Sequence, residues 1–259
     1  MTEPRETTGG RGTQASALDD QIVEIMETAS SLADASTRYH QPRREQLDRE
    51  LQEIKDNVLR MGGLVEDSIH AAIRALIEHD AEASSAVIAG DARINEMQRK
   101  ISTMITGTIA TQSPVARDLR FLLSLDHVSY ELERMGDHAA SVAKQARKLA
   151  PQPPLKRYVD LPEMGEIAAR LVRGILRALV DIDQNAAREV AVEDDDIDRL
   201  YHRTFDEVVD LMRQDPGNVE RGTRTLFAAH YIERIGDRVT NIAEDVVFLA
   251  TGEIEDLNP

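Results

Sequence analysis

Two five-residue stretches, Glu133–Arg134–Met135–Gly136–Asp137 and Glu233–Arg234–Ile235–Gly236–Asp237, lie 100 residues apart and differ at one position. The likeness extends outward from them. A shift of 103 residues aligns Met61–Ile94 with Met164–Ile197 without a gap. The shift falls to 102 and then 100 further along, so the length changes lie in a predicted turn, where insertions are tolerated. The chain therefore carries one unit of about a hundred residues twice.

Apolar residues recur at three- and four-residue spacing through both copies, as in the series Leu47, Leu51, Ile54, Val58 and Met61. This period is typical of amphipathic helices. Because short connections make neighbouring helices antiparallel, we expect an all-α fold of two tandem three-helix bundles. The predicted helices span residues 43–79, 81–112, 115–149, 160–188, 190–213 and 218–250.

Composition agrees with this fold class and limits the function. The chain of 259 residues has 3% aromatic residues and no tryptophan, so aliphatic residues and alanine must supply the core. A net charge of -16 repels phosphate backbones, which disfavours nucleic acid as a partner. No secretion signal is present, and the most apolar segment, Ile167–Val180, contains three arginines. We therefore expect a cytoplasmic protein without membrane insertion.

Three regions are predicted along the chain. Residues 1–38 form an N-terminal extension, with a disordered tail over residues 1–17 and a possible short helix over Leu18–Leu32. The two repeats occupy residues 39–151 and 158–253. The proline-rich Pro151–Gln152–Pro153–Pro154 is the best linker candidate between them.

The third helix of each copy carries the most informative pattern. Glu133 and Asp137 are four residues apart, so both carboxylates lie on one helix face, and Glu233 with Asp237 repeats the arrangement. Like charges at this spacing oppose the helix by ~0.2–0.5 kcal/mol, and a mid-helix glycine costs ~1 kcal/mol. A bound cation would explain the carboxylates, and a close helix contact would explain the glycine. A solvated acidic face is the competing interpretation.

Cysteine is absent, so carboxylates, amides or histidines would have to hold any metal. Oxygen donors projecting from neighbouring helices suit iron, manganese or magnesium. His230 also lies on this face, but its counterpart Tyr130 is a poor ligand. Weaker candidate ligands accompany the two carboxylate pairs, namely Asp91, Asn95, Asp194, Asp198 and Asn241.

Nothing in the sequence predicts an enzyme. The faces lack the Glu-x-x-His pattern of di-iron oxidases, and the chain has no nucleophile elbow or glycine-rich phosphate loop. A carboxylate-bridged metalloenzyme and a metal-free helical scaffold remain as alternatives. The first predicted helix of each copy carries a basic stripe, which is either a solvated face or a docking surface. It consists of Arg170, Arg173 and Arg177 in the second copy and is matched in part by His70 and Arg74 in the first.

Several of these stretches resemble the PhoU family of bacterial phosphate-transport accessory and regulatory proteins. The resemblance runs from about Tyr39 to Gly252. Besides the two five-residue stretches, it rests on Leu59–Ile69, Gly90–Asn95, Pro114–Phe121 and Asn241–Glu244.

This resemblance implies two repeats related by pseudo-twofold symmetry, with multinuclear metal clusters at Glu133 with Asp137 and at Glu233 with Asp237. It also implies a negative regulator of the phosphate-starvation response. Such a protein contacts the ATPase subunit of a phosphate transporter and a sensor histidine kinase, and a homodimer is expected. An accessory role for another ion transporter is the alternative. The chain departs from the family pattern at Ser141, where asparagine is usual, and at Arg238, where histidine is usual.

Overall fold

The computed structural model describes residues 12–257, with side chains from residue 44 onward. This part of the chain contains helices and no strand, and none of its helices is long and apolar enough to cross a membrane. It divides into two units, Met1–Arg49 and Glu50–Pro259. The helices are α1 (Gly12–Ile77), α2 (Ala81–Gln112), α3 (Ala116–Leu149), α4 (Asp160–Asp181), α5 (Gln184–Gln214) and α6 (Val219–Thr251), with a 3₁₀ turn over Pro216–Asn218.

Helix α1 begins earlier than the sequence pattern predicts. The short helix expected over Leu18–Leu32 and the helix expected from residue 43 are one continuous helix that starts at Gly12. It includes residues 12–17, which composition assigns to a disordered tail, whereas residues 1–11 lie outside the described part. No glycine occurs between Gly12 and Gly62, and alanine, leucine, glutamate and arginine are frequent there, which favours helix propagation. Pro42 opposes it, because an interior proline lacks a backbone N–H and costs about 3 kcal/mol.

The boundary between α4 and α5 also differs from the prediction, which places it near residue 189. Helix α4 ends at Asp181 because Ile182 adopts a left-handed conformation with φ 51°. Asp183 then caps α5, since its Oδ1 accepts hydrogen bonds from the backbone N–H groups of Asn185 (2.9 Å) and Ala186 (3.1 Å). The apolar period continues across this turn, so periodicity alone does not detect it.

The first repeat contains the same turn. His79 has φ 55° and Asp80 caps α2 through the same two types of backbone hydrogen bond. The pair Asp80 and Asp183 is one that the 103-residue shift aligns. In both copies, therefore, a residue in the left-handed conformation followed by an aspartate N-cap begins the second helix.

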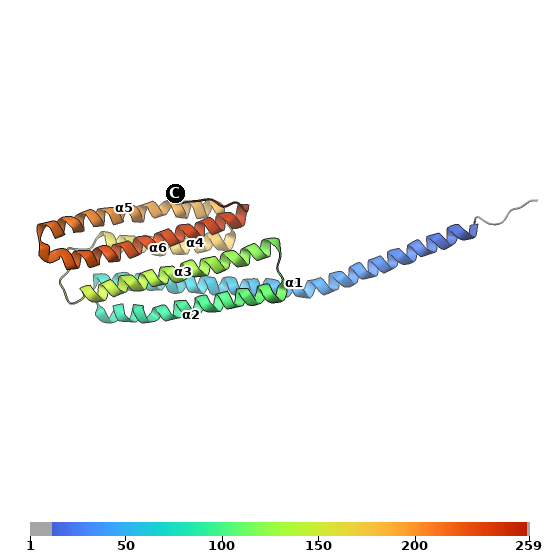
Figure 1. Cartoon of the computed structure of the whole chain (residues 1–259), viewed down its shortest axis with the longest axis horizontal. Coiled ribbons are helices and arrows are strands. Elements are labelled where there is room, and N and C mark those ends of the chain that lie inside the picture. Colours follow the sequence, from blue (N-terminus) through green and yellow to red (C-terminus); the bar gives the residue numbers. More distant parts are fainter. Residues whose placement is uncertain (1–11, 258–259) are drawn as a thin grey trace, which may run out of the picture. The chain divides into compact units, whose positions relative to one another are not determined.

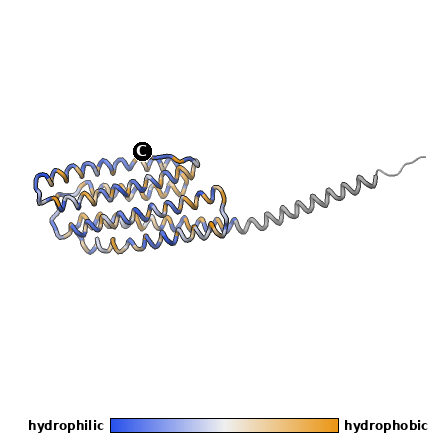
Figure 2. Tube along the Cα trace, in the orientation of Figure 1, coloured by the Kyte–Doolittle hydropathy of each residue, from blue (hydrophilic) through white to orange (hydrophobic). Residues whose placement is uncertain are grey.

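Within residues 50–259, the six helices lie side by side (Figure 1). Helix α3 packs against α2 and α6, and α6 also packs against α4 and α5. Hydrophobic residues recur along each helix (Figure 2), and the largest fully buried side chains are leucine, isoleucine or methionine. Burying each contributes about 1.5–3 kcal/mol. The core is aliphatic, as the composition predicts.

Two glycines reveal the symmetry between the repeats. A Cβ atom on Gly62 of α1 would overlap the side chain of Leu176 in α4, and a Cβ on Gly165 of α4 would lie 2.5 Å from Cγ1 of Ile73 in α1. The 103-residue shift converts Gly62 into Gly165 and Ile73 into Leu176. The same contact is thus made twice in reciprocal directions, as a pseudo-twofold relation requires. The prediction of two three-helix bundles related by pseudo-twofold symmetry is confirmed.

Candidate functional site

The first acidic site lies between α2 and α3. Asn95 Nδ2 of α2 donates a hydrogen bond of 3.1 Å to Asp91 Oδ2, one turn away. The other oxygen of Asp91 and the amide oxygen of Asn95 are buried and have no hydrogen-bond partner among the described residues. Burial, followed by the charge of Asp137, raises the pKa of Asp91 and also that of Glu133 on α3. The structure therefore brings all four predicted residues of this repeat into one electrostatic environment.

The second acidic site repeats this arrangement between α5 and α6, with deeper burial. Asp194 of α5 is 6% exposed, and its Oδ1 has no hydrogen-bond partner among the residues described. Burial, then the charges of Asp198 and Asp237, raises the pKa of Asp194 to about 7. Burial and the charge of Asp237 likewise raise the pKa of Glu233 to about 7. The four carboxylates crowd one another and hold more negative charge than the fold neutralises.

The mid-helix glycines are explained by the close helix contact that the sequence suggests. A Cβ on Gly136 would lie 2.9 Å from Cδ1 of Ile94 and 3.4 Å from Oδ1 of Asp91. A Cβ on Gly236 would overlap the carboxylate of Asp194. The glycines therefore let the carboxylates of α2 and α5 approach the backbone of α3 and α6.

The two sites differ in their donors. Asp198 in the second site stands where the first has Asn95, and His230 stands where the first has Tyr130. His230 Nδ1 lies 3.3 Å from Glu233 Oε2 without forming a well-oriented hydrogen bond, and burial lowers the pKa of this histidine. The second site thus holds one more carboxylate than the first, and an imidazole where the first has a phenol ring.

Cations already present neutralise only part of this charge. Arg234 pairs with Asp237 on the same helix. No matching ion pair between Arg134 and Asp137 is formed in the described part of the first repeat, although the charge of Arg134 lowers the pKa of Glu133 in opposition to burial. Arginine therefore does not satisfy the buried oxygens of either site.

Asn241 forms a hydrogen bond between the two repeats. Its Nδ2 donates a hydrogen bond of 3.2 Å to Oε2 of Glu131 on α3, a residue that also lies 3.5 Å from Arg238 Nη1. Nearby, His127 Nδ1 of α3 lies 2.6 Å from Asp245 Oδ2 of α6, an interaction that raises the pKa of His127. These residues join the two repeats, so Asn241 contributes to the α3–α6 contact.

Sequence reasoning missed Thr240, whose Oγ1 donates a 3.4 Å hydrogen bond to Asp194 Oδ2. A signal for it exists, because Thr240 follows Gly236 by four residues and so lies on the same helix face. The first repeat has Ala140 at this position. The hydroxyl is a further difference between the two sites.

The residue types at both sites suit a hard or borderline cation, but their side chains are not yet arranged to bind one. No three His, Cys, Asp or Glu side chains within the described part are grouped closely enough to hold a metal ion as they stand. Each site nevertheless contains buried oxygens without a partner, drawn from carboxylates and, in the first site, an amide. Binding a cation there would require rotation of side chains, and it would satisfy those oxygens.

The sequence is similar to a known domain family and to several curated proteins. The family model described as "PhoU domain" matches the chain twice, at residues 58–146 and 161–246. A "Phosphate-specific transport system accessory protein PhoU homolog" from Clostridium acetobutylicum is 36% identical over 210 residues, covering 81% of this chain and 96% of that protein. The homolog of the same name from Pseudomonas aeruginosa is 35% identical over 209 residues, covering 80% and 86%.

Solved structures agree with these sequence matches. The crystal structure of PhoU from Pseudomonas aeruginosa superimposes with a TM-score of 0.76 at 35% identity, covering 80% of this chain and 99% of that one. The phosphate transport system regulatory protein PhoU from Streptococcus pneumoniae gives a TM-score of 0.74 at 31% identity, covering 81% and 99%. Both repeats are thus included in the match.

Proposed function

The chain belongs to the PhoU family, and we propose that it is a non-enzymatic accessory protein of a phosphate transport system. In this proposal it acts in the cytoplasm as an adaptor between the ATPase subunit of the transporter and a sensor histidine kinase, and it represses the phosphate-starvation response when phosphate is plentiful. It acts by contact and conformational bias, without chemistry on a substrate. A homodimer stays a prediction, to be measured by light scattering of the purified chain.

One observation carries this proposal. Relatives that are named accessory proteins of phosphate-specific transport match four fifths of the chain and nearly their own full length. The correspondence therefore includes both repeats and both acidic sites. Surfaces on α1–α6, rather than an added domain, would then make the functional contacts.

Deletion of the gene tests the regulatory role. Transcripts of phosphate-starvation genes are measured in cells grown in high phosphate, with and without a plasmid copy of the wild-type gene. Derepression in the deletion strain, reversed by the plasmid, is expected. Continued repression in the deletion strain would falsify the negative-regulator proposal.

The two acidic sites are proposed to bind cations, with iron, manganese or magnesium as the expected metals. In the first repeat Asp91, Glu133 and Asp137 would hold the metal, with the amide oxygen of Asn95. A bound cation would supply positive charge that offsets the repulsion among these carboxylates. The glycine in the third helix of each repeat positions these oxygens, because it lets the carboxylate of Asp91 or Asp194 on the second helix approach the backbone of the third.

In the second repeat the corresponding ligands would be Asp194, Asp198, Glu233 and Asp237. The support for this site is the buried Oδ1 of Asp194, which lacks a partner, together with the raised pKa values of Asp194 and Glu233. Because cation binding favours the ionised carboxylates, it would release protons near pH 7.

Elemental analysis by mass spectrometry tests both sites. Untagged wild-type protein is compared with a Glu133→Ala, Asp137→Ala, Glu233→Ala, Asp237→Ala variant, and circular dichroism establishes that the variant is helical. Stoichiometric metal in the wild type and its loss in the folded variant are expected. Equal and negligible metal in both proteins would contradict the site assignment.

A further inference from the structure

Two histidines stand beside the second acidic site at positions where the first site has no nitrogen donor for a metal. His230 of α6 and His202 of α5 each lie within one helical turn of a carboxylate of the site. The first repeat has Tyr130 and Arg99 at the equivalent positions, a phenol and a permanent cation. The two copies of the site therefore differ in nitrogen donors as well as in carboxylates.

His230 is placed to share an ion with a carboxylate. Its Nδ1 lies 3.3 Å from Oε2 of Glu233, a buried oxygen that has no hydrogen-bond partner among the described residues. Two donors that are each about 2.1 Å from one metal ion lie about 3.0–3.4 Å apart, from octahedral to tetrahedral geometry. The rings of Tyr201 and Tyr231 pack beside His230, with centroid distances of 6.2 and 5.9 Å. These neighbours limit the directions in which the imidazole can turn.

His202 has the hydrogen bond that is typical of a metal-binding histidine. Its Nδ1 lies 2.8 Å from the backbone carbonyl oxygen of Asp198. Because a carbonyl oxygen only accepts, Nδ1 carries the proton and Nε2 keeps the lone pair that a metal binds. Burial and the charge of Asp237 raise the pKa of Asp198 and of Glu233, and the charge of His202, when the ring is protonated, opposes both rises. The ring therefore lies near carboxylates of both helices.

His138 of the first repeat does not take the same place. It follows Asp137 directly, but consecutive residues of a helix do not face each other. Its ring stacks on Tyr231 of α6, with 6.0 Å between the ring centroids. The first acidic site is thus left with oxygen donors.

A buried oxygen without a partner points independently to a ligand at the second site. Asp194 is 6% exposed, and its Oδ1 accepts no hydrogen bond from the described part of the chain. Burying such an oxygen is unfavourable, and a bound cation would compensate for it. The nitrogen donors decide which cation suits the site. Imidazole suits zinc, iron and nickel, whereas carboxylate, carbonyl and water ligands suit magnesium and manganese.

We propose that the second acidic site selects a borderline transition-metal ion, such as Zn²⁺ or Fe²⁺, which His230 and His202 bind together with its carboxylates. The first site, which has only oxygen donors, selects a hard cation such as Mg²⁺. This assignment rests on the cation binding proposed above, and it adds nitrogen ligands and a different metal class for each copy of the site. Arg99 strengthens the difference, because it replaces a donor with a positive charge.

Metal affinity and metal coordination of the untagged, full-length chain test this assignment. Zn²⁺ and Mg²⁺ are titrated separately into metal-free protein by calorimetry, and X-ray absorption at the zinc edge identifies imidazole ligands by scattering from their ring atoms. His230→Tyr introduces the residue of the first repeat, and His202→Ala removes the second ring. His127→Phe is the matched control, since His127 lies 2.6 Å from a carboxylate oxygen of Asp245 and the second repeat has phenylalanine at its position. Circular dichroism establishes that each variant is helical.

His230→Tyr and His202→Ala should each lower the Zn²⁺ affinity by about tenfold or more and weaken the imidazole scattering, with the Mg²⁺ affinity within about threefold of wild type. His127→Phe should leave both affinities unchanged. Unchanged Zn²⁺ affinity in both site variants, oxygen-only zinc coordination in the wild type, or an equal fall in Mg²⁺ affinity would overturn the assignment and leave cation binding by the carboxylates intact. A fall in Zn²⁺ affinity in His127→Phe would place the zinc elsewhere and overturn it too. A wild type that binds neither ion would overturn the proposed cation sites, and this assignment with them.

The reciprocal exchange tests the same idea in the first repeat. Tyr130→His and Arg99→His are introduced together into the chain whose second site is disabled by Glu233→Ala and Asp237→Ala. The Zn²⁺ affinity of the first site should rise about fivefold or more over the same background without the two histidines. No rise would overturn the assignment, and this result does not depend on the folding of the His230 and His202 variants.

Discussion

Replacing Gly236 by alanine is expected to destabilise the protein even though alanine favours helices. In an open helical position this substitution stabilises by about 1 kcal/mol, through helix propensity. At Gly236, however, the new Cβ would overlap the carboxylate of Asp194, which is 6% exposed and bonded to Thr240. A short buried side chain has little room to move. Overpacking of this kind costs about 2–3 kcal/mol, so the net loss is about 1–2 kcal/mol.

Gly107→Ala is the control, because a Cβ at that position meets nothing within 4 Å. It should stabilise by about 1 kcal/mol, so the two variants should differ by roughly 2–3 kcal/mol. For a chain of this size each kcal/mol shifts Tm by about 2–4 °C. The expected difference is therefore roughly 4–12 °C in thermal unfolding followed by circular dichroism, in a buffer containing a chelator.

The same reasoning predicts which of the two mid-helix glycines is the more costly to replace. Gly136→Ala should cost less than Gly236→Ala, since the Cβ there would lie 2.9 Å from a methyl group of Ile94 and 3.4 Å from Asp91 Oδ1, with no overlap of a carboxylate. If Gly236→Ala raised Tm as much as Gly107→Ala does, the carboxylate of Asp194 would not pack against α6. The geometry given for the second acidic site would then be refuted.

Three further predictions follow from the acidic sites and the helix turns. Because the folded-state pKa of Asp194 and of Glu233 is about 7, against 3.8 and 4.5 for the free groups, the unfolded state binds fewer protons between about pH 4 and 7. The metal-free protein should therefore lose stability as pH rises through this window, which urea unfolding at a series of pH values would measure. Asp194→Asn should make the free energy of unfolding fall less steeply with pH. An unchanged dependence on pH would contradict the pKa assignment. Asp198→Asn should weaken Mn²⁺ binding at the second site several-fold in titration calorimetry, because it removes one of four carboxylates, and an unchanged affinity would exclude this ligand. Asp183→Ala should cost about 1 kcal/mol in urea unfolding through loss of the α5 cap, as should Asp80→Ala at the equivalent turn; no loss in either variant would mean that these caps contribute little.

Local information determined the helical elements. The duplication and the three- and four-residue period predict six helices in two bundles, because each helix must bury one apolar stripe whatever its neighbours are. Where the prediction fails, at the boundary between α4 and α5, the deciding feature is Ile182 in a left-handed conformation followed by the cap at Asp183. A period of apolar residues contains no record of that change in φ.

The acidic sites were partly predictable for the same reason. Spacing along one helix places Glu133 with Asp137, and duplication repeats the pair as Glu233 and Asp237. The same spacing placed Asn241 on their stripe, but the structure pairs it with Glu131 of α3. Which neighbour a side chain contacts depends on how helices pack against one another, and that packing joins residues more than a hundred positions apart.

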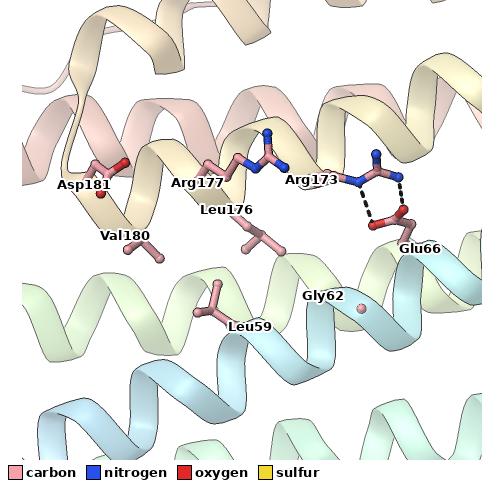
Figure 3. Close-up of a pocket in the computed structure, with 9 residues that line it drawn as sticks. Leu59, Gly62, Glu66, Arg173, Leu176, Arg177, Val180 and Asp181 are labelled. Carbon is pink, nitrogen blue, oxygen red and sulfur yellow. Dashed lines mark hydrogen bonds and ion pairs between the residues drawn. The ribbon is translucent and has the colours of Figure 1, made fainter.

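The adjacent glycines Gly62 and Gly63 separate the two kinds of information most clearly. In the sequence they are equivalent, each a penalty inside a predicted helix. Tertiary packing fills the space at Gly62 with Leu176. It leaves the space at Gly63 open beside a groove between α1 and α4, which is lined by Leu59, Leu176 and Val180 together with charged side chains (Figure 3). Helix period, duplication and the paired carboxylates follow from the sequence alone, since they depend on spacing along one chain segment. Only the tertiary structure decides how deeply Asp194 is buried, which residue Asn241 contacts and whether the space beside Gly63 is filled, because each of these depends on contacts between helices.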